Sequence, residues 1–350
     1  MSVRSIARKL GLSATAVSLA LKDSPRVSKE VRLKVQKAAK DTGYVPNARL
    51  AELMDEVRRS SSPSYKATLE AISLYPDEEP WNNRPYLKSV MQSAIDVAKS
   101  HGYRLEYFWL KKPGMSPARL RNILETRGIQ GILCLGSLNP TEEFPIELKQ
   151  FAVVTFAASI PSRLHRVISH FEADASLLFE QLRARGYKRP GLSILIHGDK
   201  RTNYTYSASY LSAQERIFAP SYLPILRADE WNLEQFENWF KTHRPDVIVM
   251  HQSSDYISNV EAWLRSQRLN VPRDIGIALL DKNPDKLHYS GISQDHARMG
   301  TTAIEMLIGR VLLHDLSSPK YPKFELVLGD WNEGKTLKSI SPSRKYSKSS

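Results

Sequence analysis

In residues 1–45, apolar positions recur with helical spacing in three short segments. Residues 5–10 and 14–21 are predicted to form two helices joined by a tight turn, because Gly11 suits a left-handed C-terminal cap and Ser13 suits an N-cap. A third helix is predicted to start at Ser28 and to end at Gly43. Seven residues would enclose the small core of this module: Ile6, Leu10, Val17, Leu21, Val31, Val35 and Tyr44. The first two helices form a helix-turn-helix pattern, whose second helix enters the major groove of DNA.

From residue 67 the pattern changes to short apolar runs that alternate with amphipathic helical segments. The first series predicts strands at 67–75, 104–110, 131–136 and 152–157, and helices at 86–100 and 117–126. The second series predicts helices at 172–185, 204–215, 233–242, 255–267 and 297–313, strands at 191–196, 223–227, 246–251, 275–280 and 324–328, and an extended segment at 289–294. This alternation is typical of an α/β fold in which helices cover both faces of a parallel sheet, and its length suits two sheets of similar size.

The net charge of +13 is unevenly distributed along the chain. Residues 1–50 hold 11 Lys or Arg against 3 Asp or Glu, residues 335–350 hold 5 against none, and residues 51–334 hold 34 of each. The N-terminal module therefore has the charge of a polyanion binder, whereas the body is neutral. The basic, Ser-rich and Lys-rich tail is expected to be disordered.

The composition, with 41% hydrophobic and 25% charged residues, is that of a soluble globular protein. There is no stretch of 18 apolar residues and no signal-peptide pattern, so we expect a cytoplasmic protein with no membrane partner. The single cysteine, Cys134, lies in an apolar run and is expected to be a buried thiol. Motifs of hydrolases, nucleotide-binding loops and metal sites are missing, so the sequence predicts no catalytic residues, no metal and no cofactor.

Residues 5–53 carry a run of motifs at characteristic spacing. They are Ser5-Ile-Ala, Gly11-Leu-Ser, Thr15-Ala-Val-Ser18, Val27-Ser28, Val31, Gly43-Tyr-Val-Pro-Asn47 and Leu53. In this run the chain resembles the lactose/galactose-repressor (LacI/GalR) family of bacterial transcription regulators. Looser matches extend the resemblance through residue 330: Gly186-Tyr-Lys-Arg-Pro, the stretch from Val271 to Asp281, and Met299-Gly300.

The resemblance implies four parts. They are a helix-turn-helix domain (1–46), a hinge helix and linker (47–66), a two-lobed, doubly wound effector and dimerisation domain of the periplasmic-binding-protein type (67–334), and the basic tail (335–350). It also implies a repressor that binds a pseudo-palindromic double-stranded DNA operator as a homodimer and responds to a small-molecule effector, a sugar or related polyol. Because the effector positions depart from the family pattern, loss of effector sensing is one alternative, and a solute-binding protein is another.

For DNA, the resemblance places base contacts at Ala14, Thr15 and Leu19, with Ser18 on the same outward side. None of these is Arg, Asn or Gln, so we expect base readout to be supplemented by Lys22 and Arg26. Contacts with phosphates are expected from Arg4, Ser13, Ser28, Lys29, Arg32 and Tyr44. The hinge would contribute Asn47, Arg49 and Leu53, with Leu53 as the wedge that inserts between base pairs. Alternatively, Leu50 and Leu53 are ordinary partners of the body, and Leu50 and Ala51 depart from the family's usual alanine and arginine.

For the effector, the resemblance points to the cleft between the lobes. Tyr86 occupies the place of an aromatic residue that packs on the effector, and Asp281 that of an aspartate that accepts hydroxyl groups. Neighbouring cleft positions are His170, Tyr206, Asp255 and Gln294. For each of these residues, the alternative to binding the effector is a purely structural role.

Overall fold

The computed structural model describes residues 7, 10–13, 16–17, 20, 27–41, 67–139, 141–147, 149–156, 158–251, 254–282 and 287–340. The chain divides into two compact units, residues 1–64 and 65–350, which we describe separately.

The first unit has a small core. Its buried residues are Ala7, Val17, Ala20, Val35, Ala38 and Ala39, with Leu10, Leu12, Val27 and Val31 partly buried around them. Gly11 has the expected positive φ of +64°. The Ser13 hydroxyl accepts the Ala16 N–H at 3.1 Å, and the Ser28 hydroxyl accepts the Val31 N–H at 3.4 Å, at the start of helix α3 (Lys29–Asp41). These contacts confirm the two predicted N-caps. Of the predicted core, Ile6, Leu21 and Tyr44 lie outside the described residues.

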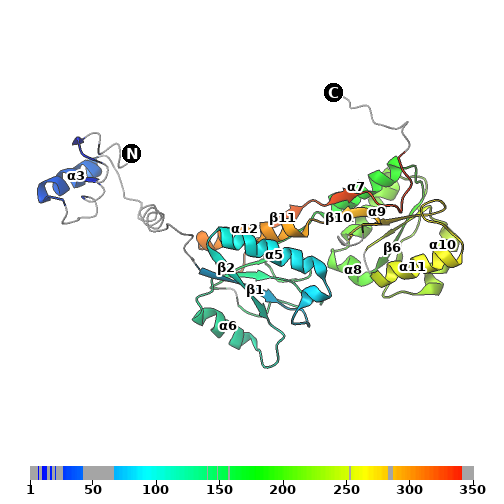
Figure 1. Cartoon of the computed structure of the whole chain (residues 1–350), viewed down its shortest axis with the longest axis horizontal. Helices are drawn as coiled ribbons and strands as arrows, with labels where there is room; N and C mark the ends of the chain where they lie inside the picture. Colours follow the sequence, from blue (N-terminus) through cyan, green and yellow to red (C-terminus); the bar gives the residue numbers. More distant parts are fainter. Residues whose placement is uncertain are drawn as a thin grey trace. The chain divides into compact units, whose positions relative to one another are not determined.

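The second unit consists of two lobes, each built on a six-stranded sheet (Figure 1). In lobe 1 the strand order is β11-β5-β4-β3-β1-β2, and every pairing is parallel. The bounds are β1 (Ala67–Ser73), β2 (Tyr103–Trp109), β3 (Gly131–Cys134), β4 (Ala152–Thr155), β5 (His165–Ser169) and β11 (Phe324–Val327). Helices α5 (Pro85–Ser100) and α12 (His296–Leu312) cover one face, α6 (Pro117–Thr126) covers the other, and a short 3-10 helix spans Pro80–Asn82.

In lobe 2 the strand order is β12-β10-β9-β8-β6-β7, with only β12 antiparallel to its neighbour among the pairings described. The bounds are β6 (Pro190–Leu195), β7 (Leu226–Ala228), β8 (Val247–Met250), β9 (Gly276–Leu279), β10 (Ser290–Ser293) and β12 (Asp330–Asn332). Helices α7 (Phe171–Ala184) and α9 (Thr205–Arg216) cover one face, and α10 (Leu233–His243) and α11 (Ser254–Ser266) cover the other. A short helix, α8 (Ile196–Arg201), follows β6.

The chain crosses between the lobes three times. It leaves lobe 1 after β5, returns after β10 to form α12 and β11, and leaves again between β11 and β12. Each lobe is therefore assembled from segments that are far apart in the sequence. These crossings hold the carboxyl ends of the two sheets on either side of one cleft.

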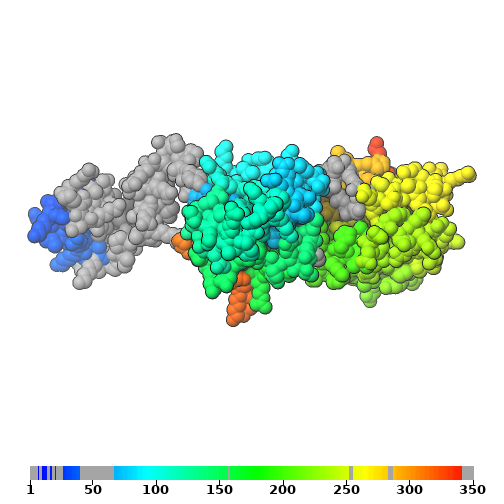
Figure 2. Space-filling view, turned by 90° about the horizontal axis from the view of Figure 1, so that it is seen from below, coloured from blue at the N-terminus to red at the C-terminus, as the bar shows by residue number. Residues whose placement is uncertain are grey.

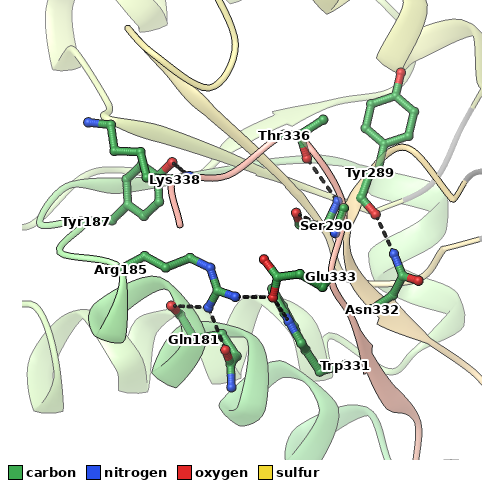
Figure 3. A network of polar contacts seen from close by, with 11 residues as sticks. Gln181, Arg185, Tyr187, Tyr289, Ser290, Trp331, Asn332, Glu333, Thr336 and Lys338 are labelled. Carbon is green, nitrogen blue, oxygen red and sulfur yellow. Dashed lines mark hydrogen bonds and ion pairs between the residues drawn. The ribbon is translucent and has the colours of Figure 1, made fainter. Parts of the chain in front are cut away.

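The sequence assigned residues 335–350 to a disordered tail, and the structure corrects this assignment for residues 335–338 (Figure 3). Thr336 is fully buried in lobe 2, where its hydroxyl donates to the Ile277 carbonyl at 2.7 Å and accepts the Ser290 N–H at 2.9 Å. The Lys338 N–H donates to the Tyr187 hydroxyl at 3.1 Å. Residues 341–350 lie outside the described residues.

A buried arginine fastens the same C-terminal segment to α7 (Figure 3). The Arg185 guanidinium pairs with the Glu333 carboxylate and lies over the Trp331 ring, 4.9 Å from its centroid. A buried guanidinium without a partner is costly, so the ion pair with Glu333 stabilises the packing of residues 331–333 against α7. The body of the protein thus extends past residue 334.

Four short elements were not predicted, namely the 3-10 helix at Pro80–Asn82, β5, α8 and β12. The remaining strands and helices of this unit lie within about three residues of their predicted ends. Cys134 is fully buried, as predicted, and burial raises the pKa of its thiol to about 11. Among the helices of the described ranges, none is long and apolar enough to cross a membrane.

Candidate functional site

A cavity of about 210 Å³ lies between the two lobes, which Figure 2 shows as a cyan-to-teal mass and a green-to-yellow mass. Lobe 1 and its crossings contribute aromatic and apolar side chains, among them Tyr86, Phe156 and Met299. Lobe 2 contributes most of the charged and polar ones, among them Arg201 and Asp281. The cavity therefore has one apolar wall and one polar wall, which is the usual composition of a small-molecule site.

The polar residues reach the cavity because they follow the carboxyl ends of strands. Ser169 ends β5, His251 follows β8, Asp281 follows β9 and Gln294 follows β10, while Phe156 follows β4. In a parallel sheet the carboxyl ends lie at one edge, so residues distant in sequence converge there. The crossings then bring the two edges together.

Three of the six predicted effector residues line the cavity, namely Tyr86, Asp281 and Gln294. Gln294 is held in place, since its carbonyl oxygen accepts the Ser169 hydroxyl at 2.7 Å and its amide donates to the Tyr206 hydroxyl at 3.2 Å. The ligand-binding role of all three residues stays a prediction.

The other three predicted residues lie elsewhere. His170 is the N-cap of α7, where Nδ1 accepts the Ala173 N–H at 3.3 Å. Tyr206 is fully buried behind the cavity wall, with its ring centroid 5.4 Å from that of Phe171 and 5.3 Å from that of His251. Asp255 is exposed in the first turn of α11. The structure thus gives His170 and Tyr206 supporting roles that their positions in the sequence did not reveal.

The Asp281 carboxyl is the acidic group of the cavity. Its pKa is raised to about 7, chiefly by burial and also by the nearby Asp174, while the Arg201 charge partly offsets both effects. Among the described residues no donor is hydrogen-bonded to this carboxylate. Asp281 is therefore an acceptor available to a ligand hydroxyl.

Two histidines that the sequence interpretation did not select also line the cavity. Burial lowers the pKa of both His251 and His296 to about 4, so both rings are neutral at pH 7. His296 is 9% exposed, stacks obliquely on Tyr86 with centroids 5.1 Å apart, and its buried Nδ1 has no hydrogen-bond partner among the described residues. A buried imidazole nitrogen without a partner is unfavourable unless a ligand or water supplies one.

The DNA-binding residues are only partly described. Ser13 and Ser28 are exposed, and because each hydroxyl uses only an acceptor position in capping its helix, its proton remains available to a phosphate. Lys29, Lys34 and Lys37 are exposed on α3, and Arg32 on the same helix is partly buried. The Lys34 ammonium lies 3.1 Å from the Glu30 carboxylate. The remaining predicted DNA contacts lie outside the described residues: Arg4, Ala14, Thr15, Ser18, Leu19, Lys22, Arg26, Tyr44, Asn47, Arg49 and Leu53.

Comparison with known families places both units. Residues 2–47 match the family model of bacterial regulatory proteins of the lacI family, and residues 179–330 match that of the periplasmic binding protein-like domain. The HTH-type transcriptional repressor CytR of Escherichia coli (strain K12) is 23% identical over 327 residues, which cover 89% of each chain. The resemblance to the lacI family that the N-terminal motifs predict is thereby confirmed.

Solved structures support the fold of this chain over nearly its whole length. A transcriptional regulator CelR–cellobiose complex has a TM-score of 0.55 at 15% identity and covers 96% of this chain and 99% of its own. The lac repressor dimer bound to operator and an anti-inducer has a TM-score of 0.55 at 15% identity. The match covers 97% of this chain and 99% of the repressor chain. At these identities the similarity establishes the two-lobed architecture. It does not transfer the ligands of those proteins to this chain.

Proposed function

We propose that this lacI-family regulator is a cytoplasmic repressor whose affinity for its operator is controlled by a small molecule held between the two lobes. The observation that carries the proposal is the combination, in one chain, of a basic module of net charge +8 with a two-lobed body whose cavity contains acceptors and donors without partners. The module supplies attraction to phosphates, and the cavity supplies a means of control.

On DNA, two subunits would present two modules to a pseudo-palindromic operator, as the dimeric relative bound to its operator suggests. Ala14, Thr15 and Leu19 offer one hydroxyl and two apolar contacts to the bases. Because such contacts discriminate modestly, Lys22, Arg26 and DNA bending at Leu53 would supply the rest of the specificity.

In the cleft, Asp281 would accept hydroxyl groups of the effector and Tyr86 would pack against its ring, which suits a sugar or a related polyol. One relative was solved with cellobiose, which supports this class. The effector acts only if it binds the DNA-competent and incompetent arrangements of the protein unequally. By linkage, the factor by which the effector changes the protein's affinity for the operator equals the factor by which the operator changes the protein's affinity for the effector.

Footprinting of the purified protein on DNA flanking its own gene tests the regulator. We expect two protected half-sites related by two-fold symmetry, and a steep loss of affinity between 50 and 200 mM salt because counterions are released on binding. Protection without two-fold symmetry, or binding insensitive to salt, would contradict the proposal. A solute-binding protein would retain no DNA at any salt concentration.

A substitution in the hinge tests the predicted wedge. Leu53→Ala should lose most of the DNA bend and about tenfold or more in operator affinity, because the bend is stabilised by an apolar side chain inserted between base pairs. Leu50→Ala is the matched control and should retain both. Circular-permutation gel shifts measure the bend, and an unchanged angle in Leu53→Ala would mean that another residue is the wedge.

A further inference from the structure

We propose that the effector is an acid, a single hydroxylated ring that bears a carboxylate or phosphate group, and that Arg201 binds this anionic group. The inference rests on the proposed function, since it identifies the chemical class of ligand that the cleft would take. The family match does not specify this class of ligand. Arg201 lies in the short helix α8, which none of the motifs that carry the resemblance covers.

The Arg201 guanidinium lines the cavity without a partner of its own. Among the described residues, it forms no ion pair with any carboxylate and donates no hydrogen bond, although it is half-buried. Burial raises the pKa of Tyr75 in lobe 1 and of Asp281 in lobe 2 and lowers that of His251 in lobe 2. The Arg201 charge lowers all three pKa values, so Arg201 lies among groups of both lobes.

Among the described residues, the other arginines with buried side chains each have at least one hydrogen-bond or ion-pair partner, although the Nε atoms of Arg185 and Arg310 have none. Arg166 donates to the Ile160 and Ser162 carbonyls, Arg185 pairs with Glu333, and Arg310 pairs with Asp315 at 2.7 Å. A guanidinium is a forked donor that matches the oxygens of carboxylate and phosphate, and a cation left without a partner in a cavity is costly. A ligand anion would supply the missing partner.

The backbone around Arg201 is fixed by the corner between α8 and α9. Asp199 is buried there and accepts the Ser207 hydroxyl, while its carbonyl accepts the Tyr204 N–H at 2.8 Å and the Thr202 hydroxyl at 3.0 Å. Asn203 and Tyr204 both have positive φ, at 52° and 60°, a conformation that such residues adopt at a cost. The hydrogen bonds of Asp199 maintain this turn, so Arg201 is presented to the cavity from a defined position.

The rest of the cavity suits the remainder of such a ligand. Asp281 can accept a hydroxyl group but would repel an anion. The hydroxylated end of the ligand would therefore lie at Asp281 and the anionic end at Arg201. The unpartnered Nδ1 of His296 offers a further polar contact. The cavity of about 210 Å³ is below the range typical for drug-sized ligands, which favours a single ring against the wall formed by Tyr86 and Phe156.

Matched ligand pairs test the proposal on the full-length protein. Galactose, galacturonate and galactose 6-phosphate, together with the corresponding glucose series, are titrated by calorimetry. We expect at least one acid to bind about tenfold or more tightly than its neutral parent. Arg201→Gln should abolish that preference, whereas Arg216→Gln, an arginine on α9 that lines a different groove, should preserve it. The carboxylate and phosphate arms identify which anion is recognised.

A second variant keeps the test independent of folding. Asp281→Asn should weaken neutral sugars, and should weaken acids less because it also removes a charge that repels the anion, so the preference for acids is kept. Equal binding of neutral sugars and acids, a preference that survives in Arg201→Gln, or the absence of binding by every acid in the panel would overturn the inference. Operator footprints of the wild type and the variants are recorded in parallel, because a lost footprint in the wild type would refute the proposed function instead.

Discussion

At the residue scale, the Asp281 carboxyl links the stability of the body to pH. Its pKa is raised from 3.8 in the unfolded chain to about 7 in the folded protein, chiefly by burial. As pH rises from about 4 to 7, the unfolded chain releases this proton while the folded protein retains it, so stability falls across this window. Above pH 7 the cost is fully present.

Asp281→Asn should therefore stabilise the protein at pH 8 and leave it unchanged below pH 4. The full shift corresponds to about 4 kcal/mol at ~1.4 kcal/mol per unit, and the partial exposure of the side chain reduces the expected gain to about 1–2 kcal/mol. Urea denaturation at both pH values measures it. Asp255→Asn, on the exposed start of α11, is the control and should change stability by less than about 0.5 kcal/mol. An equal effect of Asp281→Asn at pH 4 and pH 8 would contradict this linkage.

The residues that the sequence could identify in the cavity are those placed by long, regular elements. Tyr86 lies at the start of a strongly patterned helix, and Asp281 directly follows an apolar strand. Arg201 was missed because α8 has only six residues and therefore no measurable periodicity. Tyr206 was assigned to the cavity although it belongs to the buried stripe of α9, which also includes Tyr210 and Ala213.

At the element scale, α5 and α12 approach each other closely at Gly300. A Cβ atom there would overlap the Val90 carbonyl oxygen and the Ser93 hydroxyl on α5, and the backbone cannot move away cheaply. Gly300→Ala should therefore destabilise the protein by about 2–3 kcal/mol, because overpacking forces the two helices apart.

Gly309 on the same helix is a matched control, since a Cβ there would meet nothing within 4 Å. Gly309→Ala should stabilise the protein by about 0.5–1 kcal/mol, because glycine is unfavourable in a helix interior. Thermal and urea denaturation of the pair measure both effects. Equal effects of the two substitutions would mean that helix propensity, and not the close approach, dominates at Gly300.

The elements that sequence patterns missed are short and depend on distant partners. β12 has three residues and pairs with β10, about 40 positions earlier. β5, with the sequence His-Arg-Val-Ile-Ser, begins with two polar residues and is covered on its outer edge by β11, more than 150 positions later. Such strands are determined by long-range pairing and burial, which the local pattern of apolar residues does not contain.

At the scale of the whole molecule, lobe 1 is completed by α12 and β11 only after the chain has formed most of lobe 2. The sequence predicted two sheets of equal size but could not assign these late elements to the first sheet, because adjacency along the chain favours the second. The composition of the cleft follows from this topology, since Gln294 and His296 lie at the return crossing. Long-range topology is thus the part of the site that local patterns could not provide.

The two units should unfold separately. Among the described residues of the first unit, the buried core consists of Ala and Val side chains, which bury little apolar surface, whereas the lobes contain several extensive cores. Because a module of about 45 residues is marginally stable alone, we expect a low-temperature calorimetric transition for residues 1–64 and a higher one for residues 65–350. Operator DNA at 100 times its Kd should raise the temperature of the lower transition, because binding then stabilises the module by about 2.7 kcal/mol.

A variant that begins at residue 65 should lack the lower transition and retain the upper one. A single transition that the operator shifts as a whole would mean that the module and the body fold as one cooperative unit.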